Sequence, residues 1–186
     1  GNATLLGRAR NDRLNGGPGI DIADFGQASG PIEADLDTGV VVGEGTDTLV
    51  RVEGVAGTPF DDVLTGSRRA DTLEGRKGED AISGMGGDDI LRGGDDADLL
   101  VGGTGSDTLD GGDWMDYLVG GPGDDRYDGG PGIEDVASFE FATAAVQASL
   151  AARTAAGEGA DTLVDVEWIV GSRFGVEDDV AIRRVA

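Results

Sequence analysis

The sequence predicts an all-β fold, a parallel solenoid built from coils of 18 residues and flanked by wider coils of the same kind. Three features of the 186 residues predict it. Glycine recurs at every ninth position from Gly66 to Gly129, aspartate recurs with the same step from Asp62 to Asp125, and a large apolar residue stands two positions after each aspartate. Neither a helix nor an ordinary strand has this period, so the repeat itself determines the architecture.

Each nine-residue unit divides into a turn of six residues and a strand of three. The turn is rich in glycine, which is needed where the backbone takes a positive φ or closely approaches another group. The central residue of the strand points inward and its two neighbours point outward. The expected core residues are Leu64, Leu73, Ile82, Leu91, Leu100, Leu109, Leu118 and Tyr127.

Two units make one coil with a strand on each side, and successive coils stack as parallel strands about 4.8 Å apart. Turns at one edge then come from residues 18 apart. One edge carries Asp71, Asp89, Asp107 and Asp125, and the other carries Asp62, Asp80, Asp98 and Asp116. Such rows of carboxylates repel one another unless a cation neutralises them. Calcium suits this role because it binds carboxylate and carbonyl oxygens.

Composition restricts the chemistry in the same direction. The chain has no Cys and no His, which excludes disulfides, Ser-His-Asp triads and His or Cys zinc sites and leaves cations that oxygen atoms bind. Its 37 acidic and 14 basic residues give a net charge of −23, so nucleic acid is not expected as a partner. No apolar run approaches the roughly 18 residues of a membrane span, so none is expected.

The predicted solenoid is continuous and has four parts. Residues 1–15 form a degenerate N-terminal repeat or cap, and residues 16–60 form a first longer flanking module. Residues 61–137 form the nonapeptide block, and residues 138–186 form a second flanking module with a C-terminal cap. The two flanks repeat each other, because the same apolar pattern returns at a constant offset of 114. The matching residues are Ile32, Ala34 and Leu36 in the first module and Val146, Ala148 and Leu150 in the second.

One stretch of the second flank favours two structures. The residues "FATAAVQASLAARTAA" have the composition of a helix. Their counterpart in the first flank contains Pro31 and alternates with period two, which favours a strand. We follow the repeat and expect a strand from Val146 to Leu150. The final "EDDVAIRRV" matches "FDDVLTGSR" and is expected to add one more strand.

The phrases "GGTGSDTLD" (102–110) and "GGPGDDRYD" (120–128) match the pattern GGxGxDxUx, in which U is a large apolar residue. The chain thereby resembles the RTX (repeats-in-toxin) family of hemolysin-type calcium-binding repeats, which form a parallel β-roll. The resemblance is strong from Asp62 to Asp135 and weaker near Asp12 and Asp21. It implies that the aspartate closing each turn binds calcium, that turn carbonyls complete the coordination, and that the roll is disordered until calcium arrives outside the cell.

The expected ligands would hold several ions, roughly five to eight. The aspartates are Asp71, Asp80, Asp89, Asp98, Asp107, Asp116, Asp125, Asp135, Asp62, Asp21 and Asp12. The turn glycines are Gly84, Gly87, Gly102, Gly103, Gly105, Gly120, Gly121, Gly123, Gly129, Gly130 and Gly132. Any of the aspartates could instead be an Asx-turn residue that caps its own backbone. No catalytic residue and no organic cofactor are expected.

The fourth residue of the turn differs between the two edges. It is Gly87, Gly105 or Gly123 on one edge but Asp96 or Trp114 on the other. A non-glycine residue forced to positive φ costs about 1 kcal/mol. We therefore expect stronger calcium binding on the first edge, and we expect Asp107→Ala to raise the calcium midpoint more than Asp62→Ala. Cationic side chains are expected to replace the metal in the earliest turns: Arg68, Arg69, Arg76 and Lys77.

The outward residues of one sheet form an apolar strip, whereas those of the other sheet are polar. The strip includes Val63, Leu99, Val101, Tyr117 and Val119. An exposed strip of this kind marks a contact surface, covered by a flanking module, a neighbouring domain, a partner or a second copy. The aromatic pair Trp114 and Tyr117 could alternatively stack on a saccharide. Trp168 is expected to be a core or end-cap residue.

We expect a calcium-folded structural or adhesin-type module of a larger secreted protein, located outside the cell or at its surface, and not an enzyme. Sites of the extracellular class, with a Kd of about 10⁻⁴ to 10⁻³ M, would leave the chain unfolded in the cytosol. The resemblance further implies a bacterial protein exported by type I secretion. The alternative is a carbohydrate-binding or secretion-assisting arm of a secreted polysaccharide-modifying or hydrolytic enzyme.

Overall fold

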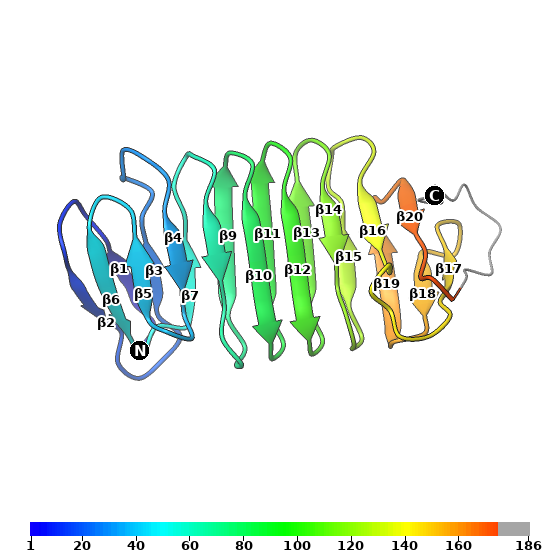
Figure 1. The fold of residues 1–186 in the computed structure, drawn as a ribbon, viewed down its shortest axis with the longest axis horizontal. Coiled ribbons are helices and arrows are strands. Elements are labelled where there is room, and N and C mark those ends of the chain that lie inside the picture. The colour runs from blue at the N-terminus through cyan, green and yellow to red at the C-terminus, as the bar shows by residue number, and fades with distance from the viewer. Residues whose placement is uncertain (175–186) are drawn as a thin grey trace.

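The structure, a computed structural model, describes residues 1–174, so the strand expected within 177–185 lies outside the described residues. The described chain forms two sheets of ten strands each, with the core between them (Figure 1). The strands run across the long axis of the molecule, and the chain advances along that axis from the N-terminal coils to the C-terminal ones. The all-β fold with stacked parallel strands is confirmed. Helices able to cross a membrane are absent from residues 1–174.

The first sheet contains, in spatial order, β1 (Thr4–Leu6), β3 (Ile22–Asp24), β7 (Gly54–Ala56), β9 (Thr72–Lys77), β11 (Ile90–Asp95), β13 (Thr108–Gly112), β15 (Arg126–Asp128), β19 (Ala160–Val164), β18 (Thr154–Ala156) and β17 (Gln147–Ser149). The second sheet contains β2 (Arg13–Asn15), β6 (Thr46–Val50), β5 (Val40–Val42), β4 (Glu33–Asp35), β8 (Val63–Thr65), β10 (Ala81–Gly86), β12 (Leu99–Thr104), β14 (Tyr117–Val119), β16 (Val136–Ser138) and β20 (Trp168–Val170). From β7 to β16, consecutive strands alternate between the sheets, so each coil contributes one strand to each.

The register confirms a coil of 18 residues. Leu91 pairs with Leu73 on one side and with Leu109 on the other, and all three strands are parallel. The second sheet repeats this step, as in the pairing of Ile82 with Leu100. One coil is longer: Leu118 pairs with Ala137, 19 residues on. The added residue of that turn is Glu134, which takes a φ of 71°.

The core consists of one inward side chain per strand. All eight residues expected there, from Leu64 to Tyr127, are at most 2% exposed. The Tyr127 hydroxyl accepts the backbone N–H of Gly120 at 2.9 Å, which satisfies the polar end of this buried ring, and Phe139 packs against it with 5.5 Å between ring centroids. Because each coil buries only two such side chains, much of its stability must come from hydrogen bonds and from the chemistry of the turns.

Each longer flanking module contains an antiparallel meander. Strands β4, β5 and β6 pair antiparallel in the second sheet, and β17, β18 and β19 do so in the first. The sequence predicted wider coils, and the extra length is instead folded back as short strands. Gly39 allows the tight return after β4 with a φ of 69°, and Arg153, its counterpart in the second module, takes 58°.

The strand expected over the alanine-rich stretch is confirmed as β17. Val146 and Ala148 are buried, as are their counterparts Ile32 and Ala34 in the first module. This alternating burial requires the period of two that a strand provides and a helix does not. Tertiary packing therefore overrides the helical propensity of the alanines.

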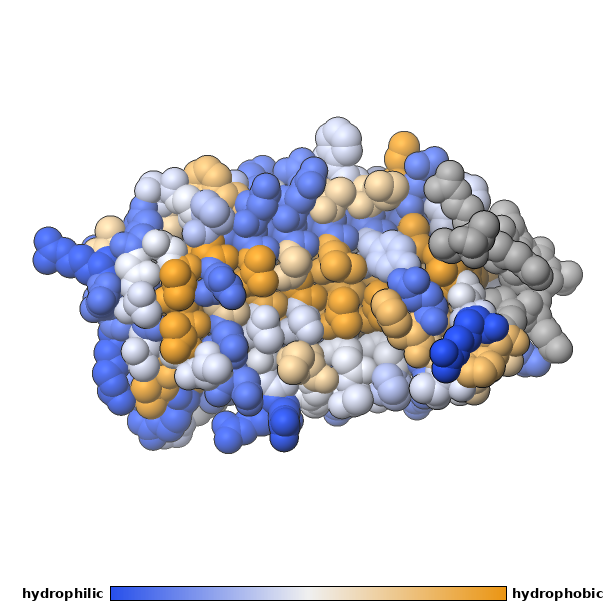
Figure 2. All heavy atoms as spheres, viewed as in Figure 1, coloured by the Kyte–Doolittle hydropathy of each residue, from blue (hydrophilic) through white to orange (hydrophobic). Residues whose placement is uncertain are grey.

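The apolar strip on the second sheet is continuous across strands. Val63, Ala81, Leu99 and Tyr117 are in-register neighbours, and Figure 2 shows an apolar band along the face that carries β10 and β12. Val63 is 47% and Leu99 is 42% exposed, but Val119 is only 7% exposed, so its predicted exposure is wrong. The hydroxyl of Tyr117 reaches Ser138 on the next strand, and we attribute the cover over Val119 to this side chain.

Candidate metal centre

The aspartate that closes each turn links its coil to the preceding one. The backbone N–H of Asp89 donates to Oδ1 of Asp107 at 2.8 Å, and that of Asp98 donates to Oδ1 of Asp116 at 2.8 Å. These bonds form two ladders, one before the strands of each sheet. The ladder of the first sheet includes Asp71, Asp89, Asp107 and Asp125, and that of the second sheet includes Asp62, Asp80, Asp98, Asp116 and Asp135.

The second carboxylate oxygen has no donor at most of these positions. In the described part of the chain, Oδ2 is buried and without a hydrogen-bond partner in eight aspartates: Asp21, Asp80, Asp89, Asp98, Asp107, Asp116, Asp125 and Asp135. A buried carboxylate oxygen without a donor is costly, so natural structures rarely leave one unsatisfied. Repetition of the same unsatisfied atom in eight turns fits a bound cation and is difficult to explain otherwise.

The glycine that opens each turn keeps the space beside this oxygen free. A Cβ atom on Gly102 would lie 2.4 Å from Oδ2 of Asp107 and 2.8 Å from the carbonyl oxygen of Gly120 in the next coil. A carboxylate oxygen and a carbonyl oxygen therefore border one small space, which any side chain would fill. The same approach to Oδ2 of the closing aspartate recurs at Gly16, Gly75, Gly84, Gly93, Gly111, Gly120 and Gly129.

The second and fourth residues of the turn adopt a left-handed backbone. Most of the predicted turn glycines do so: Gly87, Gly103, Gly105, Gly121, Gly123 and Gly130. Gly132 does not, but a Cβ there would meet the carbonyl oxygen of Trp114 at 1.7 Å. The positive φ expected at Asp96 and Trp114 is present, at 79° and 84°. Met85 on the opposite edge also takes 76°, so the strain is not confined to one edge.

Burial and mutual repulsion perturb these carboxylates strongly. Burial raises the pKa of Asp98 to about 8, and the charges of Asp80 and Asp116 in the neighbouring coils raise it further. Burial also raises the pKa of other ladder members to about 7: Asp80, Asp89, Asp116 and Asp125. Backbone N–H donors oppose the shift without cancelling it. The folded ladders therefore hold protons, or another cation, at neutral pH.

Backbone oxygens would have to supply much of the coordination. Within residues 1–174, no three acidic side chains converge as a metal-binding group. Calcium takes six to eight oxygen ligands and accepts backbone carbonyls among them. A site made of one or two aspartate oxygens and the carbonyls of glycine-rich turns fits these requirements, so the donor set suits calcium.

Four acidic residues that the sequence reasoning missed extend the ladders into the flanking modules. Oδ1 of Asp161 accepts the N–H of Asp125 at 3.0 Å, and Oδ1 of Asp47 accepts that of the partly buried Asp12 at 2.7 Å. Glu53 and Glu167 take the corresponding role for Asp21 and Asp135. The signal was present, because each of the four stands two positions before an inward apolar residue, as the repeat aspartates do.

Two turns at the start of the block differ from the rest. In turn 57–62, Thr58 donates its N–H to Oδ2 of Asp62 at 2.6 Å and its hydroxyl to Oδ1 at 2.9 Å. In turn 66–71, Ser67 donates its N–H and its hydroxyl to Oδ2 of Asp71, at 2.6 and 2.8 Å. We call these two the capped turns, and we call the eight turns with a free Oδ2 the open turns.

The cationic residues of the earliest turns lie in different places. Arg68 and Arg69 are exposed and line a cavity that also includes Glu53 and Asp71. Lys77 forms an exposed ion pair with Asp95. Arg76 alone reaches across coils, to Asp24.

The aromatic residues do not form a pair. Trp114 is 67% exposed in its turn, whereas the Tyr117 hydroxyl bonds to Ser138 and Glu140, and no ring contact joins the two within residues 1–174. Trp168 is not a core residue, since Ile169 takes the inward position of β20. It lies instead beside Val136 in the register of the second sheet, where it extends the apolar strip.

Comparison with known proteins agrees with this geometry. No curated protein matches the chain. A family profile, the RTX calcium-binding nonapeptide repeat, matches it in four copies, at residues 1–27, 56–91, 83–113 and 116–133, which together cover just over half of the chain. The repeats in which aspartate ladders and glycine turns recur are thus the repeats that define the family, and the chain belongs to the RTX calcium-binding nonapeptide repeat family.

Proposed function

We propose that the chain is a calcium-folded structural module of a secreted protein, of the kind that adhesins use as a rigid spacer, and that it has no catalytic role of its own. The observation that carries the proposal is the set of eight buried Oδ2 atoms without a donor. Their aspartates would hold the ions, together with the carbonyl oxygens of the turn glycines. Membership of a calcium-binding repeat family supports this assignment.

Calcium, when bound, supplies the positive charge that the two ladders lack. The residues of the chain do the rest. Each ladder bond, such as the N–H of Asp107 to Oδ1 of Asp125, holds one coil in register with the next. Ordering of one coil therefore places the aspartates of the following coil, which makes the transition cooperative. With a net charge of −23, the metal-free chain repels itself, and the folding free energy becomes largely the free energy of binding.

The shape of the folded chain suits a spacer. Its coils stack along one axis and contact only their neighbours, so length can be added or removed without a new core. The prominent buried carboxylates are engaged in the ladders, which leaves none paired as an acid and a base for catalysis. Extracellular calcium, at about millimolar concentration, is the level at which sites of this class fill.

Calcium should switch the chain between disorder and the roll. We expect the circular dichroism of the chelated protein at pH 8 to show mainly disorder, and millimolar calcium to produce the spectrum of a β protein. Magnesium at the same concentration is the control and should act weakly, because it demands a stricter octahedral geometry than these turns provide. A spectrum of folded β structure in excess chelator at pH 8 would remove the switch.

Aspartates of open and capped turns should contribute differently to calcium binding. We expect Asp107→Ala to raise the calcium midpoint more than Asp62→Ala and to lower the number of ions bound. Asp107 has a free Oδ2, whereas both oxygens of Asp62 already accept hydrogen bonds from Thr58. Isothermal titration calorimetry measures both quantities. Equal loss of bound ions in the two variants would contradict the assignment.

A further inference from the structure

The capped turns close their carboxylates by a change in the backbone. In open turns, the N–H of the second residue faces the next coil: that of Gly103 donates to the carbonyl of Gly120, and that of Gly112 to the carbonyl of Gly129. In the capped turns, the N–H of Thr58 or Ser67 turns inward to the aspartate of its own turn. Neither residue takes the left-handed φ that Gly103 adopts at 110°. Protein donors thus occupy the oxygen that faces a metal elsewhere.

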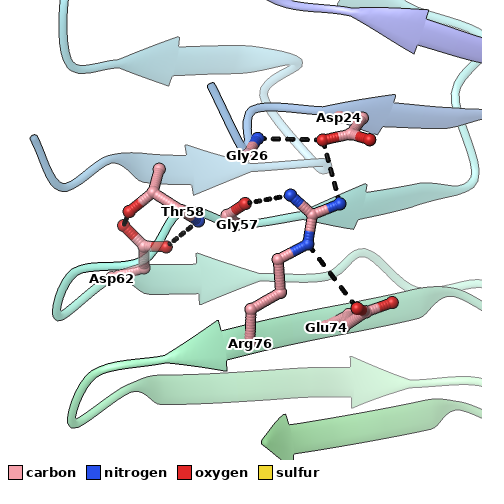
Figure 3. Close-up of polar contacts among 7 residues, drawn as sticks. All are labelled: Asp24, Gly26, Gly57, Thr58, Asp62, Glu74 and Arg76. Carbon is pink, nitrogen blue, oxygen red and sulfur yellow. Dashed lines mark hydrogen bonds and ion pairs between the residues drawn. The ribbon is translucent and has the colours of Figure 1, made fainter. Parts of the chain in front are cut away.

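Arg76 brings a protein cation to the same part of the roll (Figure 3). Its guanidinium lies 3.0 Å from Oδ1 of Asp24 in β3, donates to the carbonyl of Gly57 at 3.0 Å, and lies 3.6 Å from Glu74 in its own strand. Gly57 follows β7, so one side chain of β9 joins three neighbouring coils of the first sheet. Charge-assisted hydrogen bonds of this kind are about twice as strong as neutral ones.

The electrostatic state of Asp24 differs from that of the ladder aspartates. Burial would raise the pKa of Asp24, but the hydrogen bond and charge of Arg76 outweigh this effect and lower it. In the open turns, burial raises the pKa and the neighbouring charges are carboxylates that raise it further. The region around Arg76 therefore contains its own counter-ion, whereas the open turns lack one.

We propose that the segment from β7 to β9, residues 54–77, is folded without calcium and forms a template on which the calcium-dependent coils assemble. This inference rests on the proposed calcium-dependent folding and adds where that dependence begins, at the open turn of Asp80. The segment buries Val55, Leu64 and Leu73 and pairs with β3 and β4 of the first flanking module. Strands β8 and β9 offer their outer edges to β10 and β11.

A template has a physical advantage in a stacked fold. In a linear array, each unit is stabilised by its neighbours, so the first ordered unit is the costly one and later units add more easily. Two capped turns and the Arg76 contacts would remove that initial cost. Calcium binding would then extend order from β9 toward β15, one coil at a time.

Hydrogen exchange with mass spectrometry tests this order directly on the full chain. In excess chelator at pH 8, we expect amides of residues 54–74 to exchange at least about tenfold more slowly than those of residues 90–128. In millimolar calcium, both segments should be protected. Equally fast exchange of both segments in chelator, with protection of both in calcium, would overturn the template and leave calcium-dependent folding intact. Protection of both segments in chelator would overturn calcium-dependent folding as well.

A matched pair of variants assigns the effect to Arg76. Arg76→Gln should abolish the protection of residues 54–74 in chelator, while the spectrum and the number of bound ions in millimolar calcium stay those of the parent chain. Arg92→Gln makes the same change of charge on the next strand, β11, where the side chain is exposed and has no ion pair in the described structure, and should alter nothing. Retained protection in Arg76→Gln would contradict the role given to its guanidinium.

Discussion

Alanine in place of Gly102 is expected to raise the calcium midpoint of folding by about tenfold or more, the equivalent of about 1.4 kcal/mol. The new Cβ would lie 2.4 Å from Oδ2 of Asp107 and 2.8 Å from the carbonyl oxygen of Gly120, closer than real contacts allow. It would fill the space in which these two oxygens meet. The variant therefore has to move the aspartate, the neighbouring coil or both.

Calcium titration followed by circular dichroism measures the midpoint, and calorimetry counts the ions. The control is Gly30→Ala, because no atom lies within 4 Å of a Cβ at Gly30 and its φ is not left-handed. That variant should titrate like the parent chain. A Gly102→Ala protein with an unchanged midpoint and an unchanged number of ions would refute the view that this space is the metal site.

Acid is expected to replace calcium in part, so the chelated chain should be more folded at pH 5 than at pH 8. The pKa of an aspartate in an unfolded chain is about 3.9, whereas in the folded ladders burial raises that of Asp98 to about 8 and that of Asp80 to about 7. Between these values the folded state binds more protons than the unfolded state. Its stability is therefore complete below about pH 4 and is lost as pH rises to about 8.

Circular dichroism of the chelated protein across this range measures the effect. In millimolar calcium the slope should reverse, because protons compete with calcium for the same oxygens. Asp98→Asn, which removes the buried charge, should keep the chelated chain folded to higher pH. Asp37→Asn makes the same change at an exposed position and controls for general repulsion. A chelated chain that loses structure on acidification from pH 8 to pH 5 would contradict this account.

The repeat made most of the fold predictable. Every strand of the block has the same local instruction, a glycine turn followed by one inward apolar residue, and so Leu91 and Leu109 could be placed in the core without any knowledge of their neighbours. The flanking modules were less predictable. Their antiparallel meanders depend on a return at Gly39 or Arg153, which alternation of apolar residues alone does not reveal.

Side-chain reach accounts for the remaining differences. Val119 points outward as its strand position requires, yet it is buried, beside a tyrosine whose hydroxyl reaches the next coil. Asp161 extends a ladder 36 residues from its partner Asp125, a separation outside the nine-residue clock. Both features depend on which coils become neighbours, and a sequence read one unit at a time does not contain that information.

The sequence by itself determined the coil length, the inward positions and the two rows of aspartates, because each follows from a local pattern repeated at a constant interval. Only the tertiary structure decided which carboxylates are free to bind an ion. Asp71 and Asp89 occupy the same position of the repeat, but Ser67 closes the first, and the second keeps a buried oxygen without a donor. The difference arises from where one hydroxyl and one N–H point, and those directions are set only when neighbouring coils pack together.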